Sequence, residues 1–460
     1  MAVQKRNKPL EQDPVERGKN FKEVSLGFTE EVAVNEAMRC LQCKTAPCIS
    51  GCPVGINIPG FIKKMREKDF GGAGSVISES NLLPAICGRV CPQETQCEEK
   101  CVLNKLGNPV AIGALERFVG DYKISQGEIP KAITKNGGKI AVIGSGPAGL
   151  TCAADCAKAG FEVTIFEAFH MPGGVLTYGI PEFRLPKSIV MNEIQGLIDM
   201  GVVIEKNVVV GRTVMLDELR EEYDAVFIGT GAGLPVFLNI PGENLAGVYS
   251  ANEYLTRINL MGARLDDSAT PVQKGKNVVV VGAGNVAMDS ARTALRMGAE
   301  KVTIVYRRSR SEMPARLEEI HHAEQEGIEM MLLTNPVAVL GETKVEGIRC
   351  QKMELGAPDA KGRPRPIPIV GSEFDLFCDQ VIMAIGTSPN PLLSKVSPEL
   401  KMDRGIIVTD ENGLTSMPNV YSGGDAATGA ATVILAMSAG RKAAKAICET
   451  LFCSRCKING

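Results

Sequence analysis

The chain has 460 residues, which is enough for about three domains of ordinary size. Its formal charge of -2 at pH 7 gives no reason to expect nucleic acid or an acidic membrane as a partner. The start of the chain is polar, and no apolar run reaches the length of a membrane-spanning helix, so we expect a cytoplasmic protein without a membrane partner. With 15 cysteines and no export signal, bound metal is a better expectation than a disulfide framework.

Residues 1–136 contain two groups of four cysteines. The helix-like apolar spacing of EEVAVNEAMRCLQC and IPGFIKKMREKDF predicts a mostly helical domain around them. Zinc sites commonly use paired C-x2-C motifs, and only one such pair occurs in these two groups. The run C-x2-C-x4-C-x3-C-P is closer to the two-cluster ferredoxin pattern, whose last cysteine serves the other cluster. We therefore expect two [4Fe–4S] clusters, with structural zinc as the alternative.

Two later stretches, 139–168 and 276–308, each read as a strand, a glycine turn, a helix and a second strand. This is the pattern of a dinucleotide-binding βαβ unit. In the first stretch Gly144 allows the tight turn, Gly146 lets the backbone approach a pyrophosphate, and Gly149 allows close helix–strand packing. Glu167 ends the second strand, where a carboxylate accepts hydrogen bonds from a ribose.

The order of these parts predicts an α/β protein with nested domains. A helical two-cluster [4Fe–4S] domain would precede two Rossmann-like dinucleotide-binding domains. We place the iron–sulfur domain at 1–136, a discontinuous FAD-binding domain at 137–250 and 373–450, an inserted NADP(H)-binding domain at 251–372, and a tail at 451–460. The Pro- and Gly-rich segment 356–368 is expected to be a loop between strands of the inserted domain. For Cys448, Cys453 and Cys456 the sequence leaves open a metal site at a subunit interface or a reduced tail.

The second fingerprint is expected to bind NADP(H) rather than NAD(H). Aligning the two βαβ units places Tyr306 opposite Glu167, with two arginines next. A carboxylate at this point would repel the 2′-phosphate of NADP, whereas guanidinium groups pair with it bidentately. A solvated surface loop is the alternative reading of the arginines. The expected NADP site residues are Gly282, Gly284, Asn285, Val286, Ala287, Arg307 and Arg308.

The first fingerprint is then expected to bind FAD. A long helix of small residues follows Asp425, and its N-terminal dipole could stabilise the anionic reduced flavin, although an ordinary packing helix would look the same. Segment 171–187 is rich in Gly and Pro and would form a loop over the flavin ring. Within it Arg184 would stabilise a negative flavin or form a structural salt bridge. The expected FAD site residues are Gly144, Gly146, Pro147, Ala148, Gly149, Glu167, Gly173, Gly174, Arg184, Gly424, Asp425, Thr432 and Val433.

Other chemistries are disfavoured. The loop over the flavin carries no cysteine pair, as a disulfide reductase would need, and Cys152 and Cys156 have the spacing of buried packing residues on a helix. Only three histidines occur and no G-x-S-x-G motif is present, which argues against hydrolysis.

Several motifs carry a family resemblance that covers essentially the whole chain. RCLQCKTAPCISGCPV, LPAICGRVCPQETQCEEKC, GGVLTYGIPEFRLPK and YRRSRSEMPA resemble the NADPH-dependent glutamate synthase small-subunit family, which extends to the N-terminal half of dihydropyrimidine dehydrogenase. RNKPLEQDP and NFKEVSLGFT tilt the resemblance toward the large subunits of electron-bifurcating NADH-dependent reduced ferredoxin:NADP+ oxidoreductases. The resemblance implies hydride exchange between NADP(H) and FAD, and single-electron exchange between FAD and the clusters. The implied partners are a smaller NAD-linked flavoprotein subunit with a [2Fe–2S] cluster and ferredoxin, or alternatively the large subunit of glutamate synthase.

The resemblance also implies a crossed set of cluster ligands. The residues of the first cluster are Cys40, Cys43, Cys48 and Cys101. The residues of the second cluster are Cys52, Cys91, Cys97 and Glu116. Cys87 is then spare. Two all-cysteine sites, which would use Cys87 and release Glu116, are the alternative.

Overall fold

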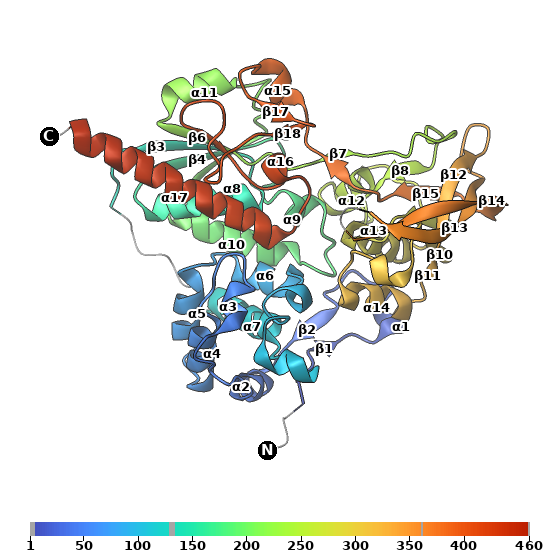
Figure 1. Cartoon of the computed structure of the whole chain (residues 1–460), viewed down its shortest axis with the longest axis horizontal. Coiled ribbons are helices and arrows are strands. Elements are labelled where there is room, and N and C mark those ends of the chain that lie inside the picture. The colour runs from blue at the N-terminus through green and yellow to red at the C-terminus, as the bar shows by residue number, and fades with distance from the viewer. Residues whose placement is uncertain (1–4, 128–133, 360–361, 459–460) are drawn as a thin grey trace.

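The structure is a computed structural model that describes residues 5–127, 134–359 and 362–458, with side chains up to residue 452. A helical domain and two α/β domains, one inserted into the other, follow in this order (Figure 1). The predicted fold class is confirmed. Within the described residues no helix is long and apolar enough to cross a membrane.

Most helices of the helical domain are short, begin at a side-chain cap or a proline, and bury apolar residues. At the start of α4, Asn57 accepts a hydrogen bond from the backbone of Gly60, and Phe61, Ile62 and Met65 are fully buried. Such a cap satisfies backbone N–H groups that lack a partner within the helix. The elements are α2 (Glu30–Met38), α3 (Pro47–Ser50), α4 (Ile58–Arg66), α5 (Phe70–Ser78), α6 (Pro84–Val90), η1 (Gln93–Thr95), η2 (Val102–Leu106) and α7 (Ile112–Gln126).

An N-terminal arm, residues 5–28, crosses from the helical domain to the inserted domain. Its strands β1 (Leu10–Glu11) and β2 (Ser25–Gly27) pair antiparallel, and α1 (Pro14–Arg17) reaches the inserted domain beside α14 (Figure 1). Arg17 ends α1 and is almost completely buried there. The arm precedes both parallel sheets in the sequence, and it contacts both the helical domain and the inserted domain.

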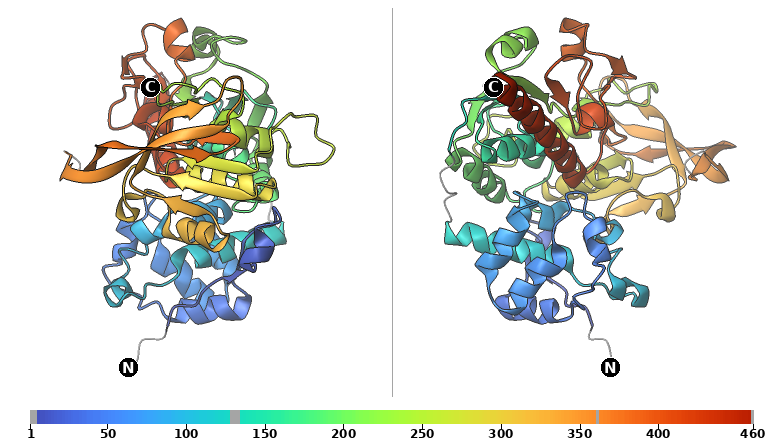
Figure 2. Two further views of the ribbon diagram at one scale, coloured as in Figure 1. Left: turned by 90° about the vertical axis from the view of Figure 1, so that its right-hand side faces the viewer. Right: turned by 60° about the vertical axis from the view of Figure 1, so that its left-hand side comes forward.

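The outer α/β domain is built on a five-stranded parallel sheet in the order β19-β6-β3-β4-β5. Its strands read as runs of Val, Ile, Ala and Phe, as expected for a sheet covered on both faces. The long helix α17 packs along α8 beside this sheet (Figures 1 and 2). The elements are β3 (Lys139–Ile143), α8 (Pro147–Lys158), β4 (Glu162–Glu167), α9 (Val175–Tyr178), α10 (Lys187–Asp199), β5 (Val203–Lys206), α11 (Leu216–Glu222), β6 (Ala225–Ile228), α15 (Leu392–Val396), β17 (Met402–Asp403), β18 (Ile406–Ile407), β19 (Val420–Ser422), α16 (Asp425–Thr428) and α17 (Val433–Ile458).

The inserted domain repeats the same plan on a second parallel sheet, in the order β11-β10-β9-β15-β8. It adds a three-stranded antiparallel sheet, β12-β13-β14, that the sequence did not predict. The elements are β8 (Val248–Ser250), α12 (Ala251–Asn259), β9 (Asn277–Val281), α13 (Asn285–Arg296), β10 (Lys301–Val305), η3 (Arg310–Glu312), α14 (Leu317–Gln325), β11 (Glu329–Met331), β12 (Thr334–Leu340), β13 (Gly347–Pro358), β14 (Pro364–Phe377) and β15 (Gln380–Met383).

Two features of the inserted domain differ from expectation. Residues 356–358 belong to β13 and residues 364–368 to β14, so strands flank the expected loop but reach further into it than predicted. The second sheet runs from β8 to β15 and thus extends past 251 and 372, because β15 pairs with β9 and β8. The chain enters and leaves this domain through a two-stranded ribbon, β7 (Leu234–Pro235) with β16 (Thr387–Ser388).

The C-terminal segment continues helix α17 as far as Ile458. Cys448 lies against Cys156 of α8, and among the described side chains it belongs to no group of three possible metal ligands. The side chains of Cys453 and Cys456 lie outside the described ones, and the alternatives for this segment stay open predictions.

Candidate electron-transfer site

The structure brings together the four cysteines expected for the first cluster, here called the first set. Residues 40 and 43 follow α2, residue 48 lies in α3, and residue 101 precedes η2, yet all four line one small cavity with apolar side chains from α4. Burial raises the pKa of the Cys40 thiol, and burial together with the neighbouring Cys40 and Cys101 thiols raises that of Cys48 to about 11. Such thiols become thiolates only when a metal supplies positive charge, which is what a cluster would do.

The residues expected for the second cluster, here called the second set, also lie together. They are Cys52, Cys91, Cys97 and Glu116. Burial, reinforced by the Glu116 carboxylate and by Cys91, raises the pKa values of the Cys52 and Cys97 thiols. The four residues come from the turn after α3, the end of α6, the turn after η1, and α7, so only the folded chain assembles them.

Glu116 is a buried carboxylate with one neutral hydrogen-bond partner. Its Oε1 accepts a hydrogen bond from Asn81 Nδ2 at 2.7 Å. Burial raises the pKa of Glu116 to about 8, which the Asn81 hydrogen bond only partly opposes. A buried carboxylate with so little compensation is costly unless a cation binds to it. The surroundings of Glu116 therefore fit a metal ligand.

Cys87, the spare cysteine of the resemblance, lies on α6 one turn before Cys91 and is fully buried. Its Sγ is 3.8 Å from Asn81 Oδ1 and 3.5 Å from Sδ of Met437 on α17. Cys87 therefore has protein partners on two sides and borders the second set. The choice between Glu116 and Cys87 as ligand stays a prediction.

The cysteine spacing favours clusters over single zinc ions. A tetrahedral zinc ion with Zn–S bonds of about 2.3 Å would hold its sulfur atoms about 3.8 Å apart. Among the side chains that the structure describes, no three cysteines have sulfur atoms within 4.8 Å of one another. Neither set therefore has three sulfur atoms as close together as the ligands of one zinc ion would be.

The first glycine fingerprint forms the turn between β3 and α8. Gly144 has a φ of +96°, and a Cβ on Gly149 would lie 1.9 Å from the Gly144 carbonyl oxygen, so both positions require glycine. A Cβ on Gly146 would meet no protein atom within 4 Å, which leaves the backbone open to a phosphate group. Pro147 and Ala148 begin α8 directly after it, so the helix N-terminus faces the same point.

Glu167 is buried at the end of β4 and is tied to this turn. Its Oε2 accepts hydrogen bonds from the backbone N–H of Ser145, at 3.0 Å, and from the Ser145 hydroxyl. Ser145 Oγ in turn accepts a hydrogen bond at 2.9 Å from the backbone N–H of Gly173, which opens the expected flavin loop. The sequence did not identify Ser145, which joins the fingerprint, the acid and the loop.

The start of α17 lies after a second glycine turn, at Gly424. Asp425 Oδ1 accepts a hydrogen bond from the backbone N–H of Ala431 at 3.2 Å, and burial raises the pKa of Asp425. Thr432 Oγ1 accepts one from the backbone N–H of Leu435 at 3.4 Å. The N-terminus of α17 is thus held by two side chains, with Val433 as its first residue.

The loop 171–187 contains the one-turn helix α9 and is held from within by Lys187. The Lys187 Nζ donates hydrogen bonds to the carbonyl oxygens of Leu176, Ile180 and Leu185 at 2.9, 2.5 and 3.1 Å. Burial lowers the pKa of Lys187 to about 8, against the effect of the nearby Glu182. Lys187 is a second residue that the sequence did not identify, because its three partners are backbone atoms.

Arg184 takes the salt-bridge role that the sequence left open. Its Nη1 lies 2.8 and 2.7 Å from the two carboxylate oxygens of Asp289, and its Nε lies 3.0 Å from Glu319 Oε1. Burial raises the pKa of Asp289 to about 6, against the opposing effect of Arg184. Arg184 and Arg292 overcome the effect of burial at Glu319 and hold its pKa at about 2. A role of Arg184 beside the flavin stays a prediction.

The second fingerprint forms the turn between β9 and α13, with Gly284 capping the helix and Val286 exposed in its first turn. The two predicted arginines point in different directions. Arg307, two residues after the end of β10, is exposed, whereas Arg308 is buried and donates a hydrogen bond from Nε to the Pro364 carbonyl oxygen at 2.9 Å. Arg307 thus fits the expected contact with a phosphate better than Arg308 does.

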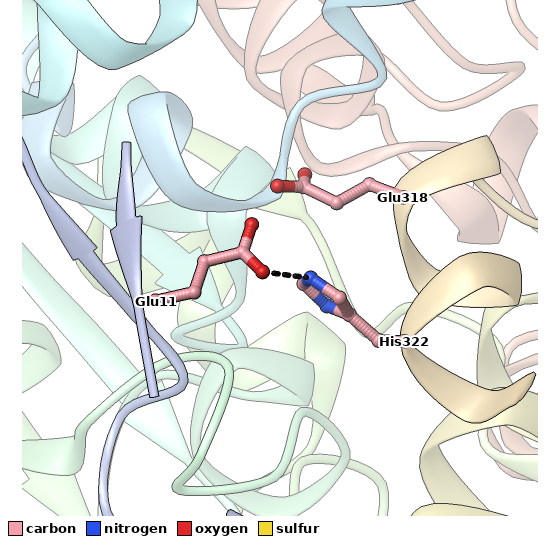
Figure 3. Close-up of side chains that lie close together, drawn as sticks. All are labelled: Glu11, Glu318 and His322. Carbon is pink, nitrogen blue, oxygen red and sulfur yellow. Dashed lines mark ion pairs between the residues drawn. The ribbon is translucent and has the colours of Figure 1, made fainter. Parts of the chain in front are cut away.

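A further group of ionisable side chains joins the arm to the inserted domain. Glu11 Oε2 lies 3.2 Å from Nε2 of His322, and Glu318 lies close to both (Figure 3). Glu11 also pairs with Arg17 at 3.2 Å, and Glu318 with Arg316 at 3.0 Å. Because both carboxylates already face a guanidinium group, the three residues form an ion-pair junction.

Known protein families match both the cysteine-rich part and the dinucleotide-binding part of the chain. Residues 17–128 match the family described as dihydropyrimidine dehydrogenase domain II, 4Fe-4S cluster, and residues 138–440 match pyridine nucleotide-disulphide oxidoreductase. The small chain of NADPH glutamate synthase from Azospirillum brasilense is 38% identical over 451 residues, covering 95% of this chain and 93% of that protein. The beta subunit of an NADP(+)-dependent formate dehydrogenase from Moorella thermoacetica is 39% identical over 435 residues, 88% of this chain, which spans only 60% of that subunit.

A solved structure shows the same fold. Mycobacterium tuberculosis FprA in complex with NADPH has a TM-score of 0.59 and 24% identity, with 70% of this chain and 86% of that chain covered. Fold, fingerprints and cysteine sets together define an NAD(P)-dependent flavin oxidoreductase with a [4Fe–4S] domain. The chain belongs to the glutamate synthase small-chain family.

Proposed function

We propose that this chain is an electron-transfer subunit that binds FAD at the first fingerprint, NADP(H) at the second, and two [4Fe–4S] clusters at the two cysteine sets. Hydride would pass between NADP(H) and FAD, and single electrons between FAD and the clusters. A flavin supplies the step from paired to single electrons that this sequence of carriers needs.

The observation that carries the proposal is the path of helix α17. Its N-terminus at Val433 is the expected contact of the flavin, and one turn later Met437 Sδ lies 3.5 Å from Cys87 Sγ at the border of the second set. A helix rises about 1.5 Å per residue, so the two points are about 6 Å apart along its axis. The expected flavin site and the second set are thus neighbours across one helix.

The ligand assignments keep the crossed pattern. We assign the first set to one cluster and the second set, with Glu116, to the other. The isolated carboxylate of Glu116 supports this assignment, since the Cys87 thiol already has Met437 and Asn81 as neighbours. Arg307 is assigned to the 2′-phosphate of NADP and Glu167 to the flavin ribose.

For the complex, we propose an electron-bifurcating NADH- and ferredoxin-linked NADP+ oxidoreductase. Its further components would be a smaller NAD-linked flavoprotein subunit with a [2Fe–2S] cluster, and ferredoxin. The N-terminal motifs of the sequence support this choice. The second candidate is the small subunit of an NADPH-dependent glutamate synthase, which the near full-length match to the Azospirillum brasilense small chain favours.

Two measurements test these proposals. Iron, sulfide and flavin analysis of the purified chain should give about eight iron atoms and one FAD, with flavin absorbance near roughly 380 and 450 nm. Zinc without iron, or a chain without flavin, would contradict the cofactor assignment. In the native complex, NADP+ reduction that depends on reduced ferredoxin supports the first candidate. NADPH oxidation that depends on 2-oxoglutarate and glutamine supports the second.

A further inference from the structure

The far end of the flavin loop is embedded in the inserted domain. The ring of Phe183 is fully buried, with the guanidinium groups of Arg292 and Arg296 at 4.8 and 4.0 Å from its centroid. Guanidinium groups at this distance from an aromatic face are attracted to it. A loop of the outer domain thus ends between side chains of α13.

Arg184, the next residue, forms a buried ion pair with the same helix. Its guanidinium lies 2.7 and 2.8 Å from the two Asp289 oxygens, and both side chains are almost fully buried. Separating a buried pair of this kind leaves an uncompensated charge on each side, so the contact resists displacement. Asn259, at the end of α12, adds a third contact through hydrogen bonds from Nδ2 to the carbonyl oxygens of Tyr178 and Gly179, at 3.2 and 3.3 Å.

All the α13 contacts lie on one face of this helix. Residues 289, 292 and 296 are separated by three and four positions, the spacing of neighbours along a helix surface. The same helix begins at Asn285, inside the second fingerprint, and its N-terminus is where the phosphates of a dinucleotide would bind. One helix therefore has the expected phosphate position at its start and contacts the flavin loop along its side.

We propose that Asp289 is a positioning residue that couples nucleotide binding at the start of α13 to the flavin, through Arg184 and the flavin loop. The proposal rests on the proposed function, because it takes FAD and NADP(H) to occupy the two fingerprints. Reduction adds negative charge to the flavin, which would attract the guanidinium group of Arg184. Asp289 pairs with that same guanidinium group. By linkage, the redox state of the flavin then changes nucleotide affinity by the same factor by which the nucleotide shifts flavin reduction.

The test uses a probe that cannot touch the flavin ring. 2′-Phospho-ADP-ribose carries the phosphates of NADP but lacks the nicotinamide. Its dissociation constant is measured on the purified holoenzyme with the flavin oxidised, and again after dithionite has delivered two electrons and solvent one proton to the flavin. We expect the two constants to differ about fivefold or more, within the usual range of coupling between sites.

Asp289→Asn should bring the ratio of the two dissociation constants close to one, because the amide can still accept a hydrogen bond from Arg184 but carries no charge. Glu324→Gln is the matched control, since it removes a carboxylate from the exposed Arg310 pair of the same domain and should keep the wild-type ratio. Arg184→Met combined with Asp289→Leu removes both buried charges and leaves neither partner unpaired. This double variant should also bring the ratio of the two dissociation constants close to one. Equal constants in the wild type, or a wild-type ratio in both Asp289 variants, would overturn the coupling. Failure of the proposed function would be seen separately, as a wild-type chain that lacks flavin or that binds ADP-ribose as tightly as the probe.

Discussion

Arg17 and Glu326 pair at 3.0 Å, although the N-terminal arm and the end of α14 are 309 residues apart in the chain. Both side chains are almost completely buried, and Glu326 also pairs with Arg292 and Arg296 at 2.8 and 2.7 Å. One carboxylate thus holds three guanidinium groups from two helices. This acid therefore adds a buried ion-pair cluster to the Glu11–His322 contact between the arm and the inserted domain.

Glu326→Gln should therefore be strongly destabilising. The substitution leaves three buried arginines without their shared carboxylate, a change that costs about 3–5 kcal/mol for a buried pair. The free energy of unfolding, measured by urea denaturation of the holoprotein at pH 7, should fall by this order. Glu300→Gln, which removes only the exposed Lys276 pair at 3.0 Å, is the control and should change it by less than about 1 kcal/mol. Similar losses of unfolding free energy in the two variants would show that the buried arginine cluster around Glu326 contributes no more than an exposed ion pair.

Glu193 should make stability depend on pH. Its carboxylate accepts hydrogen bonds from the backbone N–H groups of Ala85 and Ile86 at the start of α6, and burial raises its pKa to about 8. The folded chain therefore keeps a proton on Glu193 that the unfolded chain loses near pH 4.5. Stability contributed by this proton is present at low pH and falls as pH rises toward 8, by at most about 1.4 kcal/mol per unit.

Glu193→Gln removes this titration. Denaturation curves at pH 6 and pH 8 should differ less in the variant than in the wild type, by about 1–2 kcal/mol. The comparison is made with the clusters bound in both proteins, because iron would keep Glu116 ionised. An unchanged pH dependence in the variant would mean that other groups titrate over this range.

The assignment of Glu116, and not Cys87, as a cluster ligand predicts different iron contents for two substitutions. Cys87→Ser should keep both clusters, and the iron content should stay near about eight atoms per chain. Glu116→Ala should lose the second cluster and leave about four, because three thiolates alone do not complete the site. Iron analysis combined with EPR of the reduced protein distinguishes the two clusters. The opposite result, iron loss only in the Cys87 variant, would establish the all-cysteine alternative.

Arg307→Ala should weaken NADPH binding by about tenfold or more and leave NADH binding almost unchanged, since a hydrogen bond to a charged group contributes about 1.5–3 kcal/mol. Equilibrium titration of the holoprotein with each nucleotide measures both constants. Arg310→Ala is the matched control, because Arg310 is also exposed but already pairs with Glu324. Equal weakening for both nucleotides would remove Arg307 from the 2′-phosphate site.

The sequence predicts those parts of the fold whose signal is local. The fingerprints at 144 and 282 depend on glycines within a few residues of each other, and the structure confirms the two parallel sheets around them. Cysteine spacing likewise indicates an iron–sulfur domain, which the family match to residues 17–128 confirms. Each glycine fingerprint and each group of four cysteines lies within a short segment of the chain, so it can be recognised from neighbouring residues.

Contacts between distant segments carry no such signal. The partners of Arg184 come from α13 and α14, and the direction of Arg308 depends on β14, so neither could be read from neighbouring residues. The first residues of β14, 364–368, carry three prolines and therefore resemble a loop in sequence. This strand lies at the edge of its sheet, where a missing N–H interrupts no further strand.

The ribbon of β7 and β16 has a consequence for how this protein can be taken apart. Pro235 pairs with Thr387, so the chain enters and leaves the inserted domain through adjacent strands, about 5 Å apart. A segment cut at these two points has its ends side by side, and a two- or three-residue bridge would close the remaining chain over the gap. An inserted domain exchanged between relatives at these two points would have its ends in the right place, but it would also have to supply the buried carboxylates of Glu326 and Asp289 that pair with Arg17 of the arm and Arg184 of the flavin loop.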